Sequence, residues 1–186
     1  EQTNFEFAKA FMDNAERDPI TNEIGKTIVF CVSRKHASKI TQILNEFAMK
    51  MFPGKYNSDF AVQITSDIPD AQRMAINFAN NKLNGQTKFL DGYKSSKTRV
   101  CVTVGMMTTG YDCQDILNLC LMRPIFSPTD FVQIKGRGTR IYTFKYSNRD
   151  DEVREKKQGY KLFDFFANCE YFEEKYPYDQ VIKLPA

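Results

Sequence analysis

Apolar residues along this chain fall into two patterns, continuous runs and clusters with helical spacing. In 5–15 they recur every three or four positions before Pro19, which predicts an amphipathic helix at the start. The run 27–32 is almost wholly apolar and rich in β-branched residues, as expected of a strand buried on both faces of a parallel sheet. A second helical pattern covers 37–51 and ends near Pro53.

The same alternation of strand and helix continues along the chain. A short strand over 60–64 is followed by a capping cluster of Thr65, Ser66 and Asp67 and by a helix over 71–78. Two strands, a helix and a last strand are predicted at 99–104, 116–122, 129–135 and 160–166. This order favours an α/β fold, a doubly wound and mostly parallel sheet with helices on both faces. Such sheets bind ligands at the carboxyl ends of their strands.

The polar segment 146–159 interrupts this alternation. It carries many charged side chains of both signs and almost no apolar residue. We therefore expect an exposed excursion from the sheet that could be mobile.

The composition is that of an ordered globular unit with little net charge. An apolar content of 42%, with 16 Phe and 9 Tyr, is enough for a full core. With 26 Lys and Arg against 23 Asp and Glu, the net charge is only +3, so any nucleic-acid footprint must be local. The longest apolar runs are too short to span a bilayer, and the start is polar, so we expect a soluble cytoplasmic protein that contacts no membrane.

The cysteines and the single histidine do not suggest a metal site. The five cysteines are never spaced as Cys-x-x-Cys, and three lie in apolar strand-like runs, so we interpret them as reduced core residues. The lone His36 has no partners at ligand spacing. No metal held by His and Cys is therefore expected.

Two arginines, Arg137 and Arg140, lie three positions apart among glycines just after the predicted helix over 129–135. Glycines let the backbone turn tightly, and paired guanidinium groups match phosphate oxygens. Such a pair could stabilise charge on a transferring γ-phosphoryl group. Taken alone, the segment is more often a basic surface turn.

A second segment upstream supports the phosphate interpretation. The strand over 99–104 leads into a loop that contains Thr108, Gly110 and Asp112. A glycine permits close approach of the backbone to a phosphate, and the Asp112 carboxylate could accept hydrogen bonds from a ribose hydroxyl. Occurring together and in this order, the two segments are much harder to explain as ordinary turns.

These segments resemble conserved motifs of superfamily 2 helicases. The stretch 27–37 looks like motif IV, 103–112 like motif V, and 133–140 like motif VI, in the order and spacing of a second RecA-like lobe. Within that superfamily, the combination is similar to the restriction subunits of type I restriction-modification enzymes. The strand 162–166 resembles the segment after motif VI in that family, and the resemblance covers about 20–170.

The resemblance implies three groups of site residues. Residues that face the γ-phosphate and act in catalysis would be Gln133, Arg137 and Arg140. Residues that touch the nucleotide would be Gly110, Asp112 and Gly136. Residues on a rim that binds DNA phosphates would be Ser33, Arg34, Thr65, Ser66 and Thr108. One departure is Gly105, where many relatives carry an acid or an amide.

The resemblance also implies an ATP-dependent DNA translocase that needs other parts. The chain has no phosphate-binding Gly-x-x-x-x-Gly-Lys-[Ser/Thr] loop and no Asp-Glu pair that ends a strand, so ATP and Mg²⁺ would be held mainly by a first lobe. This chain alone should not hydrolyse ATP. The implied partners are double-stranded DNA, the first lobe and nuclease domain of the same polypeptide, and the methylation and specificity subunits.

The expected division has three parts. Residues 1–20 would be a leading helix or linker from the preceding lobe, and 21–145 the RecA-like helicase C-terminal lobe. Residues 146–186 would hold the charged excursion and a C-terminal strand and extension that complete or leave the lobe.

Several other functions stay open at the level of sequence. The chain could be the second lobe of another superfamily 2 helicase, from type III restriction, DNA repair or RNA metabolism. It could be a nucleic-acid-binding module without a motor. A metal-dependent nuclease built on Asp164 and 173–175 is disfavoured, because Glu-x-Lys arises easily by chance in a chain with 26% charged residues. A Rossmann enzyme is also disfavoured, because no Gly-x-Gly-x-x-Gly follows a predicted strand.

Overall fold

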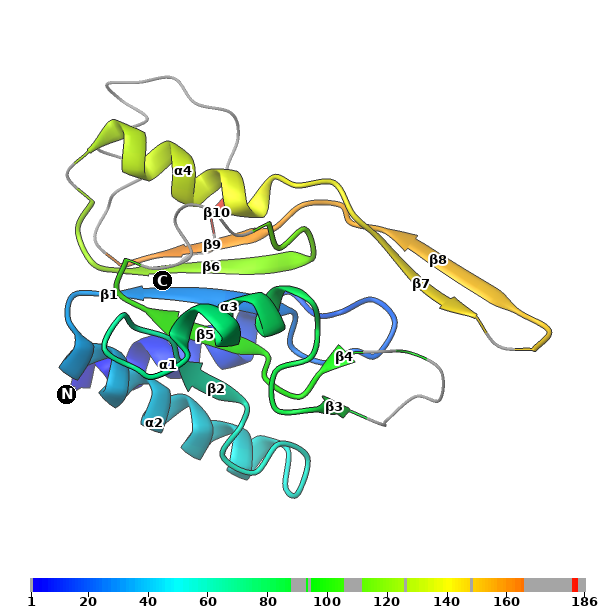
Figure 1. Cartoon of the computed structure of the whole chain (residues 1–186), viewed down its shortest axis with the longest axis horizontal. Helices are drawn as coiled ribbons and strands as arrows, with labels where there is room; N and C mark the ends of the chain where they lie inside the picture. Colours follow the sequence, from blue (N-terminus) through cyan, green and yellow to red (C-terminus); the bar gives the residue numbers. More distant parts are fainter. Residues whose placement is uncertain are drawn as a thin grey trace.

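A six-stranded sheet forms the centre of the computed structural model (Figure 1). The structure describes residues 2–87, 93, 95–105, 112–125, 127–147, 149–165 and 182–183. The strands of the sheet are β1 (Lys26–Cys31), β2 (Ala61–Gln63), β5 (Val100–Thr103), β6 (Ile116–Met122), β9 (Lys161–Asp164) and β10 (Ile182–Lys183). They are ordered β10-β9-β6-β1-β5-β2, and every neighbouring pair is parallel.

Helices cover both faces of this sheet. They are α1 (Gln2–Asn14), α2 (Arg34–Met51), α3 (Ala71–Ala79) and α4 (Pro128–Gly138). Val29 and Cys31 of β1 belong to a core cluster with α1 and α2, whereas Ile28 and Phe30 belong to a second cluster with α3 and α4. Successive side chains of a strand point to opposite faces, which explains this division. The arrangement confirms the predicted α/β class.

The continuous apolar run that predicts β1 is explained by its place in the middle of the sheet. All of its residues are buried, because β5 and β6 pair with its two sides and helices cover its two faces. The helix over 2–14 belongs to the same core, since Phe7 and Phe11 are fully buried in it. A link from this leading segment to a preceding lobe stays a prediction.

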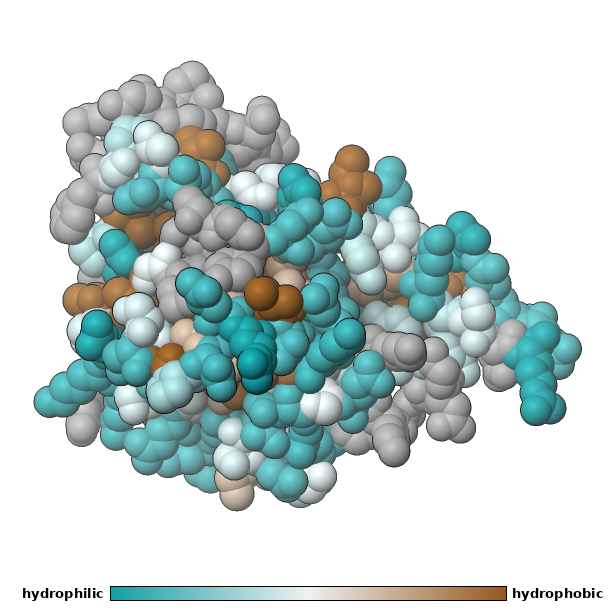
Figure 2. Space-filling view, viewed as in Figure 1, coloured by the Kyte–Doolittle hydropathy of each residue, from teal (hydrophilic) through white to brown (hydrophobic). Residues whose placement is uncertain are grey.

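Two hairpins lie outside the central sheet. One pairs β3 (Gln86–Thr87) with β4 (Ser95–Ser96), and the other pairs β7 (Thr143–Ser147) with β8 (Glu152–Lys156). The second projects away from the body of the molecule (Figure 1), and Figure 2 shows its surface as mostly hydrophilic. Most of the described residues in the excursion expected over 146–159 are exposed as predicted, although Lys157 is half-buried. Much of the segment is strand, and the hairpin begins earlier, at Thr143.

The predicted capping cluster before α3 is wrong. Thr65 Oγ1 donates a hydrogen bond to Asp67 Oδ1 at 2.5 Å, so these side chains bond to each other. The residue before the helix is Asp70, which has a φ of 62° and makes no side-chain hydrogen bond to the helix. Pro69 lies between the cluster and the helix and disfavours helical geometry in the residue before it.

A buried ion pair lies where β1 and β6 begin. Lys26 Nζ is 3.0 Å from Asp115 Oδ1, and the two side chains are only 1% and 9% exposed. Burial alone would lower the pKa of Lys26, but the neighbouring Cys113 and Asp115 raise it overall. The Asp115 carboxyl also accepts hydrogen bonds from Asn81 Nδ2 and from the Cys113 thiol. The pair is therefore charged and closely surrounded.

We predict that Asp115→Asn lowers the free energy of unfolding by about 3–5 kcal/mol, because Lys26 would be left buried without a counter-charge. Lys26→Met combined with Asp115→Asn should recover most of this loss, since neither charge then remains. Urea-induced unfolding of the two variants and the unsubstituted chain measures both effects. A double variant no more stable than Asp115→Asn would contradict the account.

Candidate functional site

Those predicted site residues that the structure describes lie at two opposite edges of the central sheet. Ser33 and Thr65 follow the carboxyl ends of β1 and β2. Asp112 precedes β6, whose first residue pairs with the first residue of β1, so it lies toward the amino edge. Arg140 follows α4, which begins beyond the carboxyl end of β6 and returns to the start of β9. The general rule that ligands bind at the carboxyl ends of strands therefore does not describe Asp112 and Arg140.

At the amino edge, Arg140 and Asp112 form a direct ion pair. Arg140 Nη2 donates to Asp112 Oδ2 at 2.7 Å, across 28 positions of sequence. Both side chains are about half exposed, 51% for Arg140 and 52% for Asp112. The hydrogen bond from Arg140 is the main reason why the pKa of Asp112 lies below its usual value, and one from Gln114 adds to it. Two residues chosen from separate motifs are thus in contact.

Arg137 lies close to this pair, and it is partly buried. Burial lowers the pKa of its guanidinium group, the charge of Arg140 lowers it further, and the charge of Asp112 acts in the opposite direction. Two guanidinium groups and one carboxylate therefore share a small region around the C-terminal end of α4. Such a cluster can bind an anion with several oxygens in a defined orientation.

The other residues expected near the nucleotide are less constrained. Gln133 is exposed on α4, about one turn before Arg137. Gly136 is half-buried in the last turn of the same helix. Gly110 and, for the rim, Thr108 lie outside the described residues.

The glycine-containing segment within 133–140 is helical as far as Gly138, so the expectation of a tight turn at these glycines is wrong. Ser127 caps the start of α4, since its Oγ accepts a hydrogen bond from Asp130 N, and the helix includes Gly136, Arg137 and Gly138. Among the described glycines, positive φ occurs only at positions 54 and 85. Side-chain hydrogen bonds instead satisfy carbonyl groups in the last turn of the helix. Thr139 Oγ1 donates to Gly136 O at 3.2 Å, and Lys157 Nζ donates to Gly138 O at 2.7 Å.

Gly138 is needed for close packing instead of for a turn. A Cβ atom at this position would lie 2.4 to 2.7 Å from ring atoms of Tyr160, which is buried just before β9. At Gly136 a Cβ atom would have no atom within 4 Å. The absent side chain of Gly138 therefore allows the end of α4, and with it Arg140, to approach the sheet.

At the carboxyl edge, the predicted rim residues are already engaged in local contacts. Ser33 Oγ accepts a hydrogen bond from His36 N at 3.1 Å and so caps α2. Arg34 Nε is 3.4 Å from Asp67 Oδ1, and Asp67 also accepts the bond from Thr65. Ser66 is exposed beside them. The rim thus contains hydroxyl groups and a cation, but an acid pairs with that cation.

Asp67 and Lys157 are two residues near these edges that the sequence pattern did not reveal as partners of the predicted residues. Asp67 looked like part of a helix cap, and Lys157 stood in a run of charged residues beside Lys156. No pattern in the local sequence distinguishes Asp67 or Lys157 from the residues around it. Both become noticeable only through contacts with residues distant in sequence.

The described residues also bear on metal binding and membranes. They contain no group of three or more His, Cys, Asp and Glu side chains that could hold a metal ion. Among the helices of the described part, none is both long and apolar enough to cross a bilayer. Four cysteines are free and buried as predicted, namely Cys31, Cys101, Cys113 and Cys120. Cys169 lies outside the described residues.

Comparison with known proteins places this chain in a family. The type I restriction enzyme EcoKI endonuclease subunit of Escherichia coli K12 is 32% identical over 140 residues, which are 75% of this chain and 10% of that protein. The EcoAI endonuclease subunit of Escherichia coli is 30% identical over 155 residues, which are 83% of this chain and 16% of that protein. The chain belongs to the type I restriction subunits. It spans only a small part of these relatives, and no protein-family model matches it.

Solved structures agree on the fold. A fragment assigned to an HsdR subunit of a type I restriction enzyme from Vibrio vulnificus YJ016 has a TM-score of 0.64 at 24% identity, and the match covers 97% of this chain and 30% of that one. The C-terminal domain of the DEAD-box protein Dbp5 has a TM-score of 0.57 at 11% identity, with 100% of this chain and 84% of that domain covered. This member of the restriction subunit family therefore has the RecA-like fold of a helicase C-terminal lobe.

The two glycines of α4 provide a matched pair of substitutions. We predict that Gly138→Ala lowers the free energy of unfolding by about 1–3 kcal/mol, because the new methyl group would collide with Tyr160. Gly136→Ala should be neutral or stabilising by up to about 1 kcal/mol, since the position is helical and open. Urea-induced unfolding of both variants tests this, and equal effects would show that the contact with Tyr160 does not constrain α4.

Proposed function

We propose that this chain is the second motor lobe of an ATP-dependent DNA translocase within a type I restriction subunit. The observation that supports it most directly is the contact between Arg140 and Asp112 beside Arg137. This cluster offers two permanently charged, planar donors at one edge of a helicase-like lobe. The relatives are named as endonuclease subunits of type I restriction enzymes.

In this proposal, Arg137 and Arg140 stabilise the charge that develops on the γ-phosphoryl group of ATP. Asp112 accepts a hydrogen bond from Arg140 at 2.7 Å and so orients its guanidinium group before a nucleotide arrives. Gln133 lies on the same helix and would reach the same phosphate from one turn earlier. Gly110, Asp112 and Gly136 would line the nucleotide side of the lobe.

The residues of this chain fit only part of an ATP site. Guanidinium groups complement phosphate oxygens, but the chain lacks the phosphate-binding loop, and the described residues lack an acidic cluster for a cation. ATP and Mg²⁺ would therefore be held mainly by a first lobe of the same polypeptide. Mg²⁺ would neutralise charge on the phosphates, while this lobe contributes its arginines across the interface.

The rim at the opposite edge would hold duplex DNA by its phosphates. The candidate residues there are Ser33, Arg34, Thr65, Ser66 and Thr108. Hydroxyl groups and a cation bind phosphate without distinguishing bases, which suits a motor that moves along any sequence. Closure of the two lobes around ATP would move this rim, provided that ATP binds the closed state more tightly than the open one. A nuclease domain and the methylation and specificity subunits would complete the enzyme.

The arginines provide the first test. In the full-length polypeptide, Arg140→Ala or Arg137→Ala should reduce ATP turnover in the presence of long duplex DNA by about a thousandfold or more, because the transition state loses a cation. Arg154→Ala is the control, since this exposed arginine pairs with Glu152 in the projecting hairpin. Its turnover should equal that of the wild type.

The outcome of this assay separates the alternatives. Wild-type turnover in Arg140→Ala would refute the role of this residue in hydrolysis. Stimulation of the wild-type protein by RNA but not by duplex DNA would retain a motor lobe and reject the restriction assignment.

The rim is tested by its salt dependence. Arg34→Ala should weaken binding of the full-length polypeptide to duplex DNA equally for different sequences, and lower the slope of log affinity against log salt by about 1. Asp67→Asn should strengthen binding, because it removes the carboxylate that pairs with Arg34. Fluorescence anisotropy with labelled duplexes at several salt concentrations measures both, and an unchanged slope in Arg34→Ala would exclude this contact.

A further inference from the structure

Lys157 connects three segments that meet at the amino edge of the sheet. Its Nζ donates to Gly138 O at 2.7 Å and to Gln114 O at 3.4 Å. Its backbone N donates to Tyr142 O at 2.8 Å. One residue at the end of β8 thus contacts the end of α4, the loop before β6 and the start of the hairpin.

The surroundings of Lys157 disfavour the charged form of its side chain. It is half-buried, and this burial lowers its pKa to about 8, although Asp115 and Cys113 partly oppose the change. The carbonyl groups in the last turn of a helix lack partners within the helix, and a cation there is favoured by the helix dipole. A charge-assisted hydrogen bond to Gly138 O therefore offsets part of the cost. The neighbouring Lys156, by contrast, is exposed.

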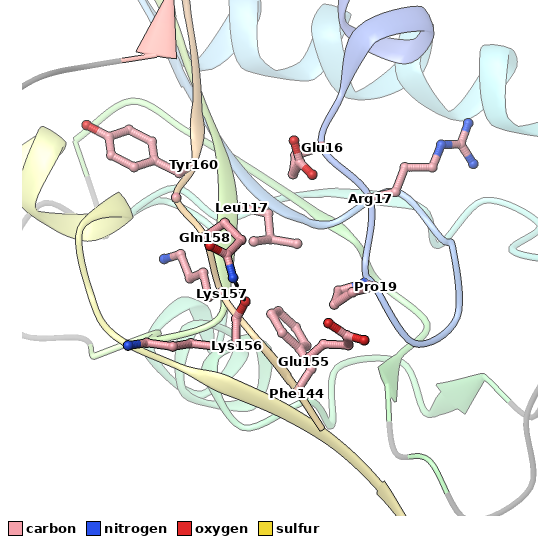
Figure 3. A pocket seen from close by; sticks show the side chains of 11 residues that line it. Glu16, Arg17, Pro19, Leu117, Phe144, Glu155, Lys156, Lys157, Gln158 and Tyr160 are labelled. Carbon is pink, nitrogen blue, oxygen red and sulfur yellow. Dashed lines mark hydrogen bonds between the residues drawn. The ribbon is translucent and has the colours of Figure 1, made fainter. Parts of the chain in front are cut away.

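Figure 3 shows Lys157 beside a pocket of about 180 Å³ between the base of the hairpin and the segment around Arg17 and Pro19. Its side chain points toward the end of α4, on the side away from Arg17. A second hollow of about 360 Å³ lies on the α4 side, and Arg140, Lys157 and Tyr160 are among its lining residues. Lys157 therefore borders the same hollow as Arg140.

The two carbonyl groups that Lys157 contacts flank the ion pair of the candidate site. Gly138 precedes Arg140 by two positions, and Gln114 follows Asp112 by two. We propose that Lys157 is a positioning residue that holds the backbone on both sides of the Arg140–Asp112 contact, and so aligns Arg140 for catalysis. The inference rests on the proposed function, because it needs Arg140 to act on the nucleotide.

The same contacts link Arg140 to the projecting hairpin. The hairpin begins at Thr143, three positions after Arg140, and its second strand ends at Lys156. The residues that flank the two strands are joined by the hydrogen bond from Lys157 N to Tyr142 O. A displacement of the hairpin base would pull on Lys157 and through it on the end of α4.

The test uses three variants of the full-length polypeptide, assayed for ATP turnover with saturating duplex DNA. Lys157→Met should lower kcat by about tenfold or more and leave KM for ATP within about twofold, because a misplaced arginine weakens transition-state stabilisation more than nucleotide binding. Lys157→Arg keeps the charge and the donors, so it should restore kcat to within about threefold of wild type. Lys145→Met is the control, because this exposed lysine of β7 is not among the lining residues of either hollow, and it should match the wild type.

Parallel measurements separate this inference from the proposed function. Arg140→Ala is assayed beside the lysine variants, and the midpoint of thermal unfolding is recorded for each protein. If Arg140→Ala is inactive but Lys157→Met turns over like wild type, the positioning role is refuted and the motor function stands. If Arg140→Ala is fully active, the proposed function itself has failed.

Two further results would also overturn the positioning role. One is a rise in KM that accounts for the whole loss in Lys157→Met, which would indicate direct nucleotide binding. The other is a failure of Lys157→Arg to recover activity although it folds. Should Lys157→Met not fold, Lys157→Gln replaces it with the same expected loss in kcat, and wild-type kcat in that variant would refute the role.

Discussion

All strands of the central sheet run in the same direction, and this constraint decides where each candidate residue lies. Parallel strands cannot be joined by tight turns, so every connection must carry the chain back from the carboxyl edge to the amino edge. Residues that directly follow a strand, such as Ser33 and Thr65, lie at the carboxyl edge. Asp112, shortly before β6, and Arg140, directly after the returning helix α4, lie at the amino edge. The topology thus separates the two groups of candidate residues.

The end of α4 shows how packing turns this topology into a defined geometry. Gly138 has no side chain, so the helix approaches the ring of Tyr160, and Lys157 bonds to the carbonyl group of Gly138. Together these contacts hold the position from which Arg140 reaches Asp112. The arginine is exposed, but the backbone that carries it is anchored to the buried Tyr160, just before β9, and to Lys157 at the hairpin base.

Buried charges give the amino edge a second set of directional contacts. Arg99 is buried like the Lys26–Asp115 pair, and it donates to Ile24 O at 2.9 Å. Its guanidinium nitrogens lie 3.6 Å from Glu23 and 3.9 Å from Asp18. Burying these groups is costly, so each must find partners in a suitable orientation. Because hydrogen bonds depend on direction, this edge accepts few alternative arrangements. The carboxyl edge, with Arg34 paired to an exposed acid, is less constrained.

The α/β class could be predicted from the amino-acid sequence, because the apolar run at β1 and the helical spacing over α2 are local patterns that burial imposes on a chain. Motif order likewise singled out Asp112, Arg137 and Arg140, since their residue types and spacing carry phosphate chemistry. The contacts of Arg140 with Asp112, of Gly138 with Tyr160 and of Arg34 with Asp67 could be found only in the folded molecule. The physical reason is that each of these contacts joins residues far apart in the chain. Their side chains have no local periodicity in common, and only the packing of the folded sheet and helices brings them together.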